Sequence, residues 1–184
     1  GQGGTWSVDG VIVFAPSLTT PLMRVPAAGG AAVAVTTLGP QQLNHAWPSF
    51  LPDGRRFLFR VGGGPDNSGI YLGALDGSTP ARLTPASSGG FYLASGRLLW
   101  VRAGTQTLVA QRLDIAKTAL TGEPVTLAEG VVLGDQGRAG VSVAATGLVA
   151  YRTGAGSQRQ LTWFDRSGTA RGTVGDPDAS LSNP

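Results

Sequence analysis

Three arginines recur at equivalent positions in the chain, and they are its most suggestive candidates for a functional role. Arg60 and Arg102 each lie seven residues after the first residue of a turn, and Arg152 lies six residues after Thr146. Each one closes an apolar segment that we expect to be a strand. In the first copy of the pattern the same place is taken by Pro16. The recurrence predicts that these side chains gather at one face of a repetitive fold.

Other polar side chains fall at places that the same fold would bring to that face. Loops after the second strand of each repeat and the connections between repeats share one face of a β-propeller. We therefore predict a binding face, whose members are His45, Arg60, Asp66, Asn67, Arg102, Asp135, Arg138 and Arg152. The alternative is that they are ordinary solvent-exposed strand ends.

Residue types that support catalysis or metal binding are scarce in this sequence. His45 is the single histidine and there is no cysteine, whereas a metal site needs several such ligands. No Gly-x-Ser-x-Gly motif occurs, and the glycine-rich segment 62–69 precedes an expected strand rather than the helix that a phosphate-binding loop requires. We predict no catalytic residue, no metal and no cofactor. His45 is expected near one mouth of the central channel, as a loop histidine hydrogen-bonded to its neighbours.

Composition favours an all-β protein with many turns. The chain has 184 residues, of which 29 are glycine and 41% are hydrophobic. The formal net charge is +3, and its basic residues are scattered, so a solvated surface is favoured over a nucleic-acid interface. The sequence contains neither a signal peptide nor an apolar stretch of the roughly 18–20 residues that a membrane helix needs. We therefore expect no nucleic-acid partner and no membrane segment in this chain.

A repeated turn gives the strongest indication of the fold. Asp9-Gly10, Asp53-Gly54, Ser95-Gly96 and Thr146-Gly147 each lead into an apolar run, at separations of 44, 42 and 51 residues. A period of about 40–45 residues with several strands in each is typical of a β-propeller. A β-sandwich, the alternative, has no reason to repeat one such unit. The two-residue turns are expected to place both central residues at positive φ.

Each repeat is expected to hold four strands. The first carries a large apolar residue three positions before its turn, namely Trp6, Phe50, Tyr92 and Val143. The second is apolar at successive positions, which indicates a strand covered on both faces. In the third repeat, residues 114–122 are expected to form a longer loop with a helical turn.

The repeats predict one partial propeller domain over residues 1–184. Its blades are expected at about 3–38, 44–86, 89–129 and 139–176, with residues 178–184 starting a fifth. Because propellers close with typically 4–8 blades, we expect an incomplete, open propeller. Its exposed blade faces could support self-association.

Four segments carry a family resemblance. They are Trp47 to Arg55, Gly69 to Gly77, Leu120 to Val125 and Gln160 to Gly168. These segments resemble the WD-repeat-like, TolB-like propellers of bacterial proteins. They are most similar to the C-terminal propeller region of membrane-anchored bacterial serine/threonine protein kinases, of the type found in acidobacteria. The resemblance covers essentially the whole chain, although the WD dipeptide itself is absent.

The resemblance implies a sensor or scaffold region that binds a protein or small-molecule ligand on the extracytoplasmic side of the membrane. None of the kinase motifs occurs here, so kinase catalysis is assigned to no residue, and the chain is not expected to be an enzyme. Two alternatives remain open: a Tol-type periplasmic envelope propeller, and the gating propeller of a prolyl-oligopeptidase-like hydrolase.

Overall fold

The chain folds almost entirely into antiparallel β-strands. The computed structural model describes residues 2–154 and 159–178 and divides into two compact units, Gly1–Thr153 and Gly154–Pro184. The first unit contains three four-stranded sheets and a two-stranded sheet, and the second contains one two-stranded sheet. The predicted all-β class is confirmed.

The three four-stranded sheets are built in the same way, with strands hydrogen-bonded in chain order. The first contains β1 (Gly4–Trp6), β2 (Val11–Phe14), β3 (Met23–Pro26) and β4 (Val33–Ala34). The second contains β5 (Gln42–Phe50), β6 (Arg56–Gly63), β7 (Gly69–Ala74) and β8 (Ala81–Thr84). The third contains β9 (Phe91–Leu93), β10 (Arg97–Val101), β11 (Leu108–Asp114) and β12 (Ala119–Ala128). Such four-stranded antiparallel sheets are the blades of a β-propeller.

The remaining strands form hairpins. In the first unit, β13 (Val141–Val143) pairs with β14 (Val149–Tyr151), after the short 3₁₀ turn η1 (Asp135–Gly137). In the second unit, β15 (Arg159–Phe164) pairs with β16 (Ala170–Asp178). Residues 139–176 thus supply strands to both units. The blade boundaries stay predictions, and of the segment 178–184 all but Asp178 lies outside the described residues.

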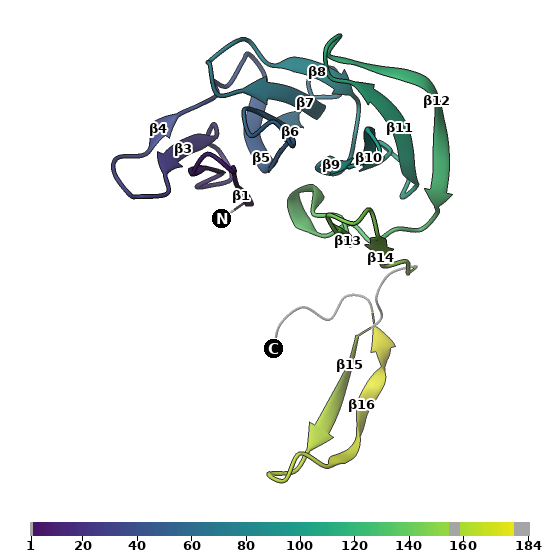
Figure 1. Ribbon diagram of the computed structural model, residues 1–184. Coiled ribbons are helices and arrows are strands. Elements are labelled where there is room, and N and C mark those ends of the chain that lie inside the picture. Colours follow the sequence, from purple (N-terminus) through teal and green to yellow (C-terminus); the bar gives the residue numbers. More distant parts are fainter. Residues whose placement is uncertain (1, 155–158, 179–184) are drawn as a thin grey trace. The chain divides into compact units, whose positions relative to one another are not determined.

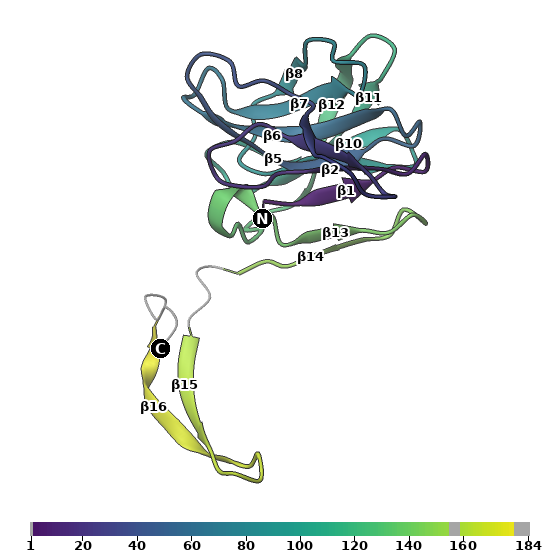
Figure 2. The ribbon, with the colours of Figure 1, turned by 90° about the vertical axis from the view of Figure 1, so that its left-hand side faces the viewer.

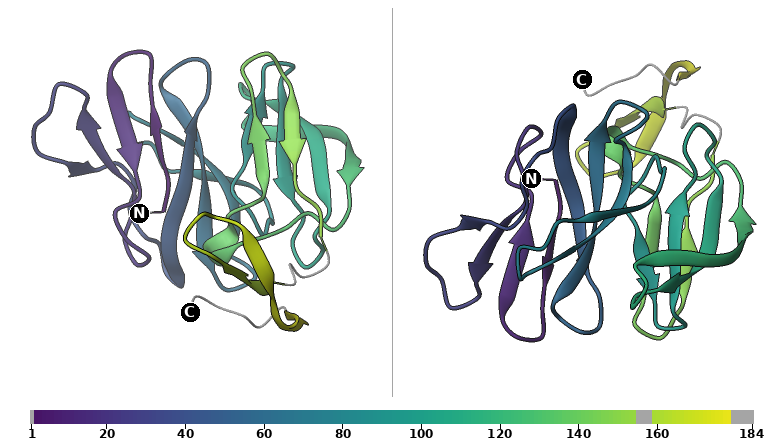
Figure 3. Two further views of the ribbon diagram at one scale, coloured as in Figure 1. Left: turned by 90° about the horizontal axis from the view of Figure 1, so that it is seen from below. Right: turned by 90° about the horizontal axis from the view of Figure 1, so that it is seen from above.

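The innermost strand of each sheet in the first unit is its first one. Figure 1 shows β1, β5, β9 and β13 around a common axis, with β4, β8 and β12 at the periphery. The views in Figures 2 and 3 show these sheets following one another around that axis. Each sheet contacts the next, through β1 and β5, β8 and β12, and β9 and β13. The described sheets form an open propeller.

The predicted turn glycines are in place, but the expected turn type is wrong. Gly10, Gly54, Gly96 and Gly147 all have positive φ, between 66° and 87°, whereas none of the residues before them does. In the first turn the Gly10 amide donates to the Ser7 carbonyl, and the Ser7 amide donates to the Val11 carbonyl. This is a type I turn followed by a left-handed glycine, so a single residue of each pair needs the left-handed conformation.

Burial on both sides, predicted for the second strand of every repeat, is confirmed for β6 and β10 but is wrong for β2, where only Val13 is buried, and for β14, whose residues are half-buried or exposed. In β6, Phe57, Phe59 and Val61 pack against Val13 and Leu22 of the first sheet. The alternate residue Leu58 faces the third sheet, where it joins a core with Leu98 and Trp100. In β10, Leu99 and Val101 point the other way, toward Val141 and Val149 of the hairpin. Alternating side chains therefore fill the spaces between successive sheets.

Two further features of the fold bear on the predictions. The expected helical turn in residues 114–122 is wrong, because β11 and β12 are joined by a four-residue turn and β12 begins at Ala119. The outward side of the first sheet is incompletely covered. Trp6, Ile12 and Val25 share one row on that side, and Trp6 is 66% exposed.

Candidate functional site

A pocket of about 380 Å³ lies where the inner strands of the first unit meet. Residues from all four inner strands line it, together with the end of η1. The lining comprises Gly3, Gly4, Thr5, Trp47, Pro48, Ser49, Gly89, Gly90, Phe91, Gly137, Arg138, Ala139 and Val141. We name it the axial pocket. Five of these residues are glycine, so much of its wall is backbone.

Trp47 forms one wall of the axial pocket in an unusual conformation. It lies in a bulge of β5 with φ of 53°, a left-handed backbone that bulky residues rarely adopt. Its indole Nε1 donates a 2.8 Å hydrogen bond to the Gln136 carbonyl, and Gln136 itself has φ of 58°. Two strained residues from different parts of the chain are therefore joined at this pocket. Such strain often accompanies function.

Two glycines make room for this tryptophan. A Cβ on Gly3 would lie 2.9 Å from the indole Cε3, and a Cβ on Gly89 would lie 2.8 Å from the Trp47 Cβ. The Trp47 amide also donates to the Gln2 carbonyl. Trp47 is thus held by the first sheet, the segment before β9 and η1. It was not among the predicted binding residues, since nothing in a local pattern reveals a left-handed bulge.

His45 lies inside the molecule rather than at the mouth of the channel. It is 1% exposed, and its ring meets the Phe59 ring edge-on at 4.9 Å. Its Nδ1 lies 2.7 Å from Thr36 Oγ1 and its Nε2 lies 3.0 Å from Gln42 Oε1. Because a carbonyl oxygen can only accept, Nε2 carries the proton, and Nδ1 accepts from the hydroxyl of Thr36. Burial lowers the pKa of His45 to about 4.

Arg60, the first of the recurring arginines, ends close to η1. It is half-buried, and its Nε lies 2.7 Å from the position that a Cβ on Gly137 would occupy. That Nε has no hydrogen-bond partner within the described residues, and neither does Oδ1 of the nearby Asn44. Burial lowers the pKa of Arg60. Arg60 of the second sheet therefore packs against Gly137 of η1.

Arg138 and Arg152 are brought together by the structure. Both line a second pocket on the β13–β14 hairpin, and Arg138 lines the axial pocket as well. Arg102 is exposed at the end of β10 and lines neither of these two pockets. The side chain of Asp135 lies outside the described residues.

Asp66 and Asn67 lie in the loop between β6 and β7. Asp66 is exposed. The Asn67 amide donates to the Gly64 carbonyl, and the Asn67 carbonyl accepts from the Tyr71 hydroxyl at 3.0 Å. Arg82 of β8 holds the same loop by donating to the Pro65 and Ser68 carbonyls. The single binding face proposed from the sequence stays a prediction.

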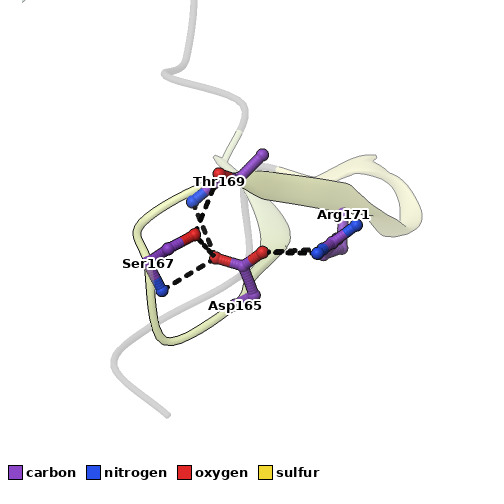
Figure 4. Close-up of polar contacts among 4 residues, drawn as sticks. All are labelled: Asp165, Ser167, Thr169 and Arg171. Atoms are coloured by element: carbon purple, nitrogen blue, oxygen red, sulfur yellow. Dashed lines mark hydrogen bonds and ion pairs between the residues drawn. The ribbon is translucent and has the colours of Figure 1, made fainter.

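A polar cluster in the second unit closes the β15–β16 turn. The Asp165 carboxylate accepts hydrogen bonds from the Ser167 and Thr169 amides and from the Ser167 hydroxyl, and it pairs with Arg171 (Figure 4). The Ser167 hydroxyl is the main reason that the pKa of Asp165 is lowered, followed by the Thr169 amide. Asp165, Ser167 and Thr169 belong to the turn and Arg171 to the start of β16, so the cluster fixes a hairpin.

Within residues 2–154 and 159–178, no group of three or more His, Asp or Glu side chains is arranged to hold a metal ion. The same residues contain no helix long and apolar enough to cross a membrane.

Known proteins resemble this chain in fold. No family model matches the sequence, and no curated protein matches it significantly. Among solved structures, TolB from Acinetobacter baumannii is similar, with a TM-score of 0.60 at 20% sequence identity. The match covers 93% of this chain and 42% of TolB, so the chain spans less than half the length of that protein. This likeness supports the TolB-like propeller fold.

Proposed function

We propose that this chain is a non-catalytic binding propeller and that its ligand occupies the axial pocket. The observation that carries the proposal is the convergence of four inner strands on one pocket walled by a strained tryptophan. Ligand sites in proteins are concave and mostly preformed, with a few polar groups that fix orientation. The axial pocket has this character, since its lining combines the aromatic residues Trp47 and Phe91 with Thr5 and Ser49.

An extended peptide segment of a partner protein fits this pocket best. Each inner strand is the edge strand of its sheet and lies toward the axis, although in β5 the His45 and Trp47 amides already donate to the Thr20 and Gln2 carbonyls. Backbone edges of this kind pair with extended peptides, and side-chain pockets add specificity. Gly4, Gly89 and Gly90 contribute backbone to the wall of this pocket.

A sensor or scaffold role in a larger bacterial signalling protein is the finer part of the proposal. Its support is the resemblance of four segments, such as Trp47 to Arg55, to the propeller regions of membrane-anchored serine/threonine kinases. The same resemblance supports an extracytoplasmic location. A Tol-type envelope propeller is the second candidate, favoured by the fold likeness to TolB. A kinase domain and a membrane helix encoded upstream in the gene would support the first candidate, whereas a signal peptide would support the second.

The binding role can be tested with a library of random heptapeptides displayed on phage and selected against the full chain. Affinities of the selected peptides would be measured by calorimetry for the wild type and three variants. Ser49→Phe fills the pocket and Trp47→Phe removes its Nε1 donor, and each should weaken binding at least about tenfold. Trp6→Phe, a change at an exposed tryptophan of the first sheet, should leave affinity unchanged.

Folding of each variant would be checked from its thermal melt. Peptides that bind Ser49→Phe as tightly as wild type would contradict the proposal, because the axial pocket would then be irrelevant to binding. A library that yields no binder of micromolar affinity would argue equally against a peptide ligand.

A further inference from the structure

A second pocket shares Arg138, Ala139 and Val141 with the axial one and carries two arginines. It has a volume of about 650 Å³ and lies on the β13–β14 hairpin and the segment that precedes it. Its charged lining residues are Arg138 and Arg152, and its hydroxyl groups come from Ser142 and Tyr151. Among the described side chains, no Asp or Glu lines it. We call it the hairpin pocket.

Strand pairing determines the face of the hairpin on which Arg152 lies. In the hairpin, Val143 pairs with Val149 and packs toward the third sheet, whereas Ser142 pairs with Ala150 and alternates to the opposite face. The Arg152 amide donates to the Gly140 carbonyl at 2.8 Å, which extends the ladder by one further pair on the Ser142 side. Arg152 therefore shares the Ser142 face of the hairpin.

Glycines leave space beside each arginine. A Cβ on Gly140 would lie 3.4 Å from the Arg152 Cβ, and a Cβ on Gly134 would lie 3.8 Å from the Arg138 Cβ. The pocket is thus bounded by small residues and by the stems of two long cationic side chains. Tyr151, 49% exposed, stands at its edge.

Backbone donors of the pocket are already used. The Gly140 amide donates to the Val132 carbonyl, the Val132 amide to the Arg152 carbonyl, and the Gly134 amide to the Arg138 carbonyl. By contrast, neither Arg138 nor Arg152 forms an ion pair with any described residue. Among the described residues, these backbone donors are therefore engaged while the two guanidinium groups form no ion pair.

We propose that the hairpin pocket binds an oxyanion, a carboxylate or a phosphate group, between Arg138 and Arg152. A guanidinium matches the planar geometry of either group and can donate two parallel hydrogen bonds to it. Two cations in one pocket repel each other, and a bound anion relieves that repulsion. The hydroxyl groups of Ser142 and Tyr151 are further donors in the same lining. This inference does not depend on the axial pocket.

The test is a titration of the full chain with succinate and, separately, with inorganic phosphate, followed by NMR at low ionic strength. Saturable shifts of the Ser142 and Ala150 amides are expected with at least one anion. Succinate alone would assign the site to carboxylates, and phosphate alone to phosphoryl groups. Arg152→Gln should weaken the affinity about tenfold, as should Arg138→Gln.

Arg102→Gln is the matched control, because it removes the same charge from an exposed arginine outside both pockets. It should change the affinity less than twofold. Equal weakening by Arg102→Gln would overturn the proposal in favour of general charge attraction, and so would the absence of saturation below about 10 mM of either anion. Ser49 lines the axial pocket alone and Arg152 lines the hairpin pocket alone, whereas Arg138 lines both. Ser49→Phe should therefore leave anion binding intact and Arg152→Gln should leave peptide binding intact, which separates the two sites.

Discussion

Protonation of His45 should destabilise the folded chain in mildly acidic solution. The imidazole is buried, edge-on to Phe59, and bonded to Thr36 and Gln42 in its neutral form. Its pKa is lowered from 6.5 to about 4 by burial. The unfolded chain therefore binds a proton between these values while the folded chain does not. Stability is complete above pH 6.5 and falls as the pH drops toward 4.

The size of the effect follows from the difference between the two pKa values. With the pKa at about 4 in the folded state, the free energy of unfolding at pH 5 is about 2 kcal/mol lower than at pH 7.5. The limiting loss below pH 4 is about 3 kcal/mol. For a unit of this size, 2 kcal/mol corresponds to a decrease of about 6 °C in the melting temperature.

The assay compares urea unfolding of the wild type and His45→Gln at pH 7.5 and pH 5. Glutamine does not titrate, so the difference in stability between the two proteins should change by about 2 kcal/mol between these pH values. The comparison cancels the contributions of other groups that titrate in both proteins. An unchanged difference would refute the reasoning.

A direct measurement remains possible if His45→Gln does not fold. His45 is the single histidine in the chain, so its ring protons give one assignable NMR signal. That signal should titrate with a midpoint near pH 4 in the folded protein. A midpoint near 6.5 would show that the imidazole is solvated.

Two more predictions concern the turns. Gly137→Ala should lower the free energy of unfolding by about 3 kcal/mol or more, because its Cβ would lie 2.5 Å from the Ser87 carbonyl oxygen. Gly77 has an equally positive φ but open space around it, so Gly77→Ala should lower the free energy of unfolding by only about 1–2 kcal/mol. Both values would be measured by urea unfolding. Similar losses would refute the steric argument. The Ser167 and Thr169 amides donate to the Asp165 carboxylate, and the pKa of Asp165 is lowered. Their NMR signals should therefore stay dispersed at neutral pH and approach random-coil values only below about pH 4. In Asp165→Asn this pH dependence should vanish.

The repeat units were predictable because they depend on local chemistry. Glycine after Asp53 or Ser95 marks a turn, and the run from Phe57 to Phe59 indicates a strand with two covered faces. The turn type was not predictable, because the aspartates and the serine before these glycines keep negative φ in a longer turn. Both the two-residue loop and the bulged loop use glycine at the same place.

The sites were less predictable because they depend on contacts between distant segments. His45 bonds to Thr36, and Trp47 donates to Gln136, 89 residues away. No local spacing specifies such partners. Arg138 and Arg152 were both predicted as binding residues, yet what unites them is the lining of one pocket, to which Arg138 comes from the segment before β13 and Arg152 from the end of β14. Arg60, chosen by the same recurrence, is instead half-buried against η1.

The double burial of β6 has a consequence for local opening. The side chains of β6 belong to two separate cores, so the sheet β5–β8 loses packing contacts on both sides when it opens. The outward side of the first sheet makes few packing contacts, so its opening breaks fewer of them. Free energies of opening should therefore fall from the second sheet toward the ends, as nearest-neighbour coupling predicts for repeat arrays. The amide protons of Phe57 to Phe59 should be the last to exchange with deuterium, and those around Trp6 among the first.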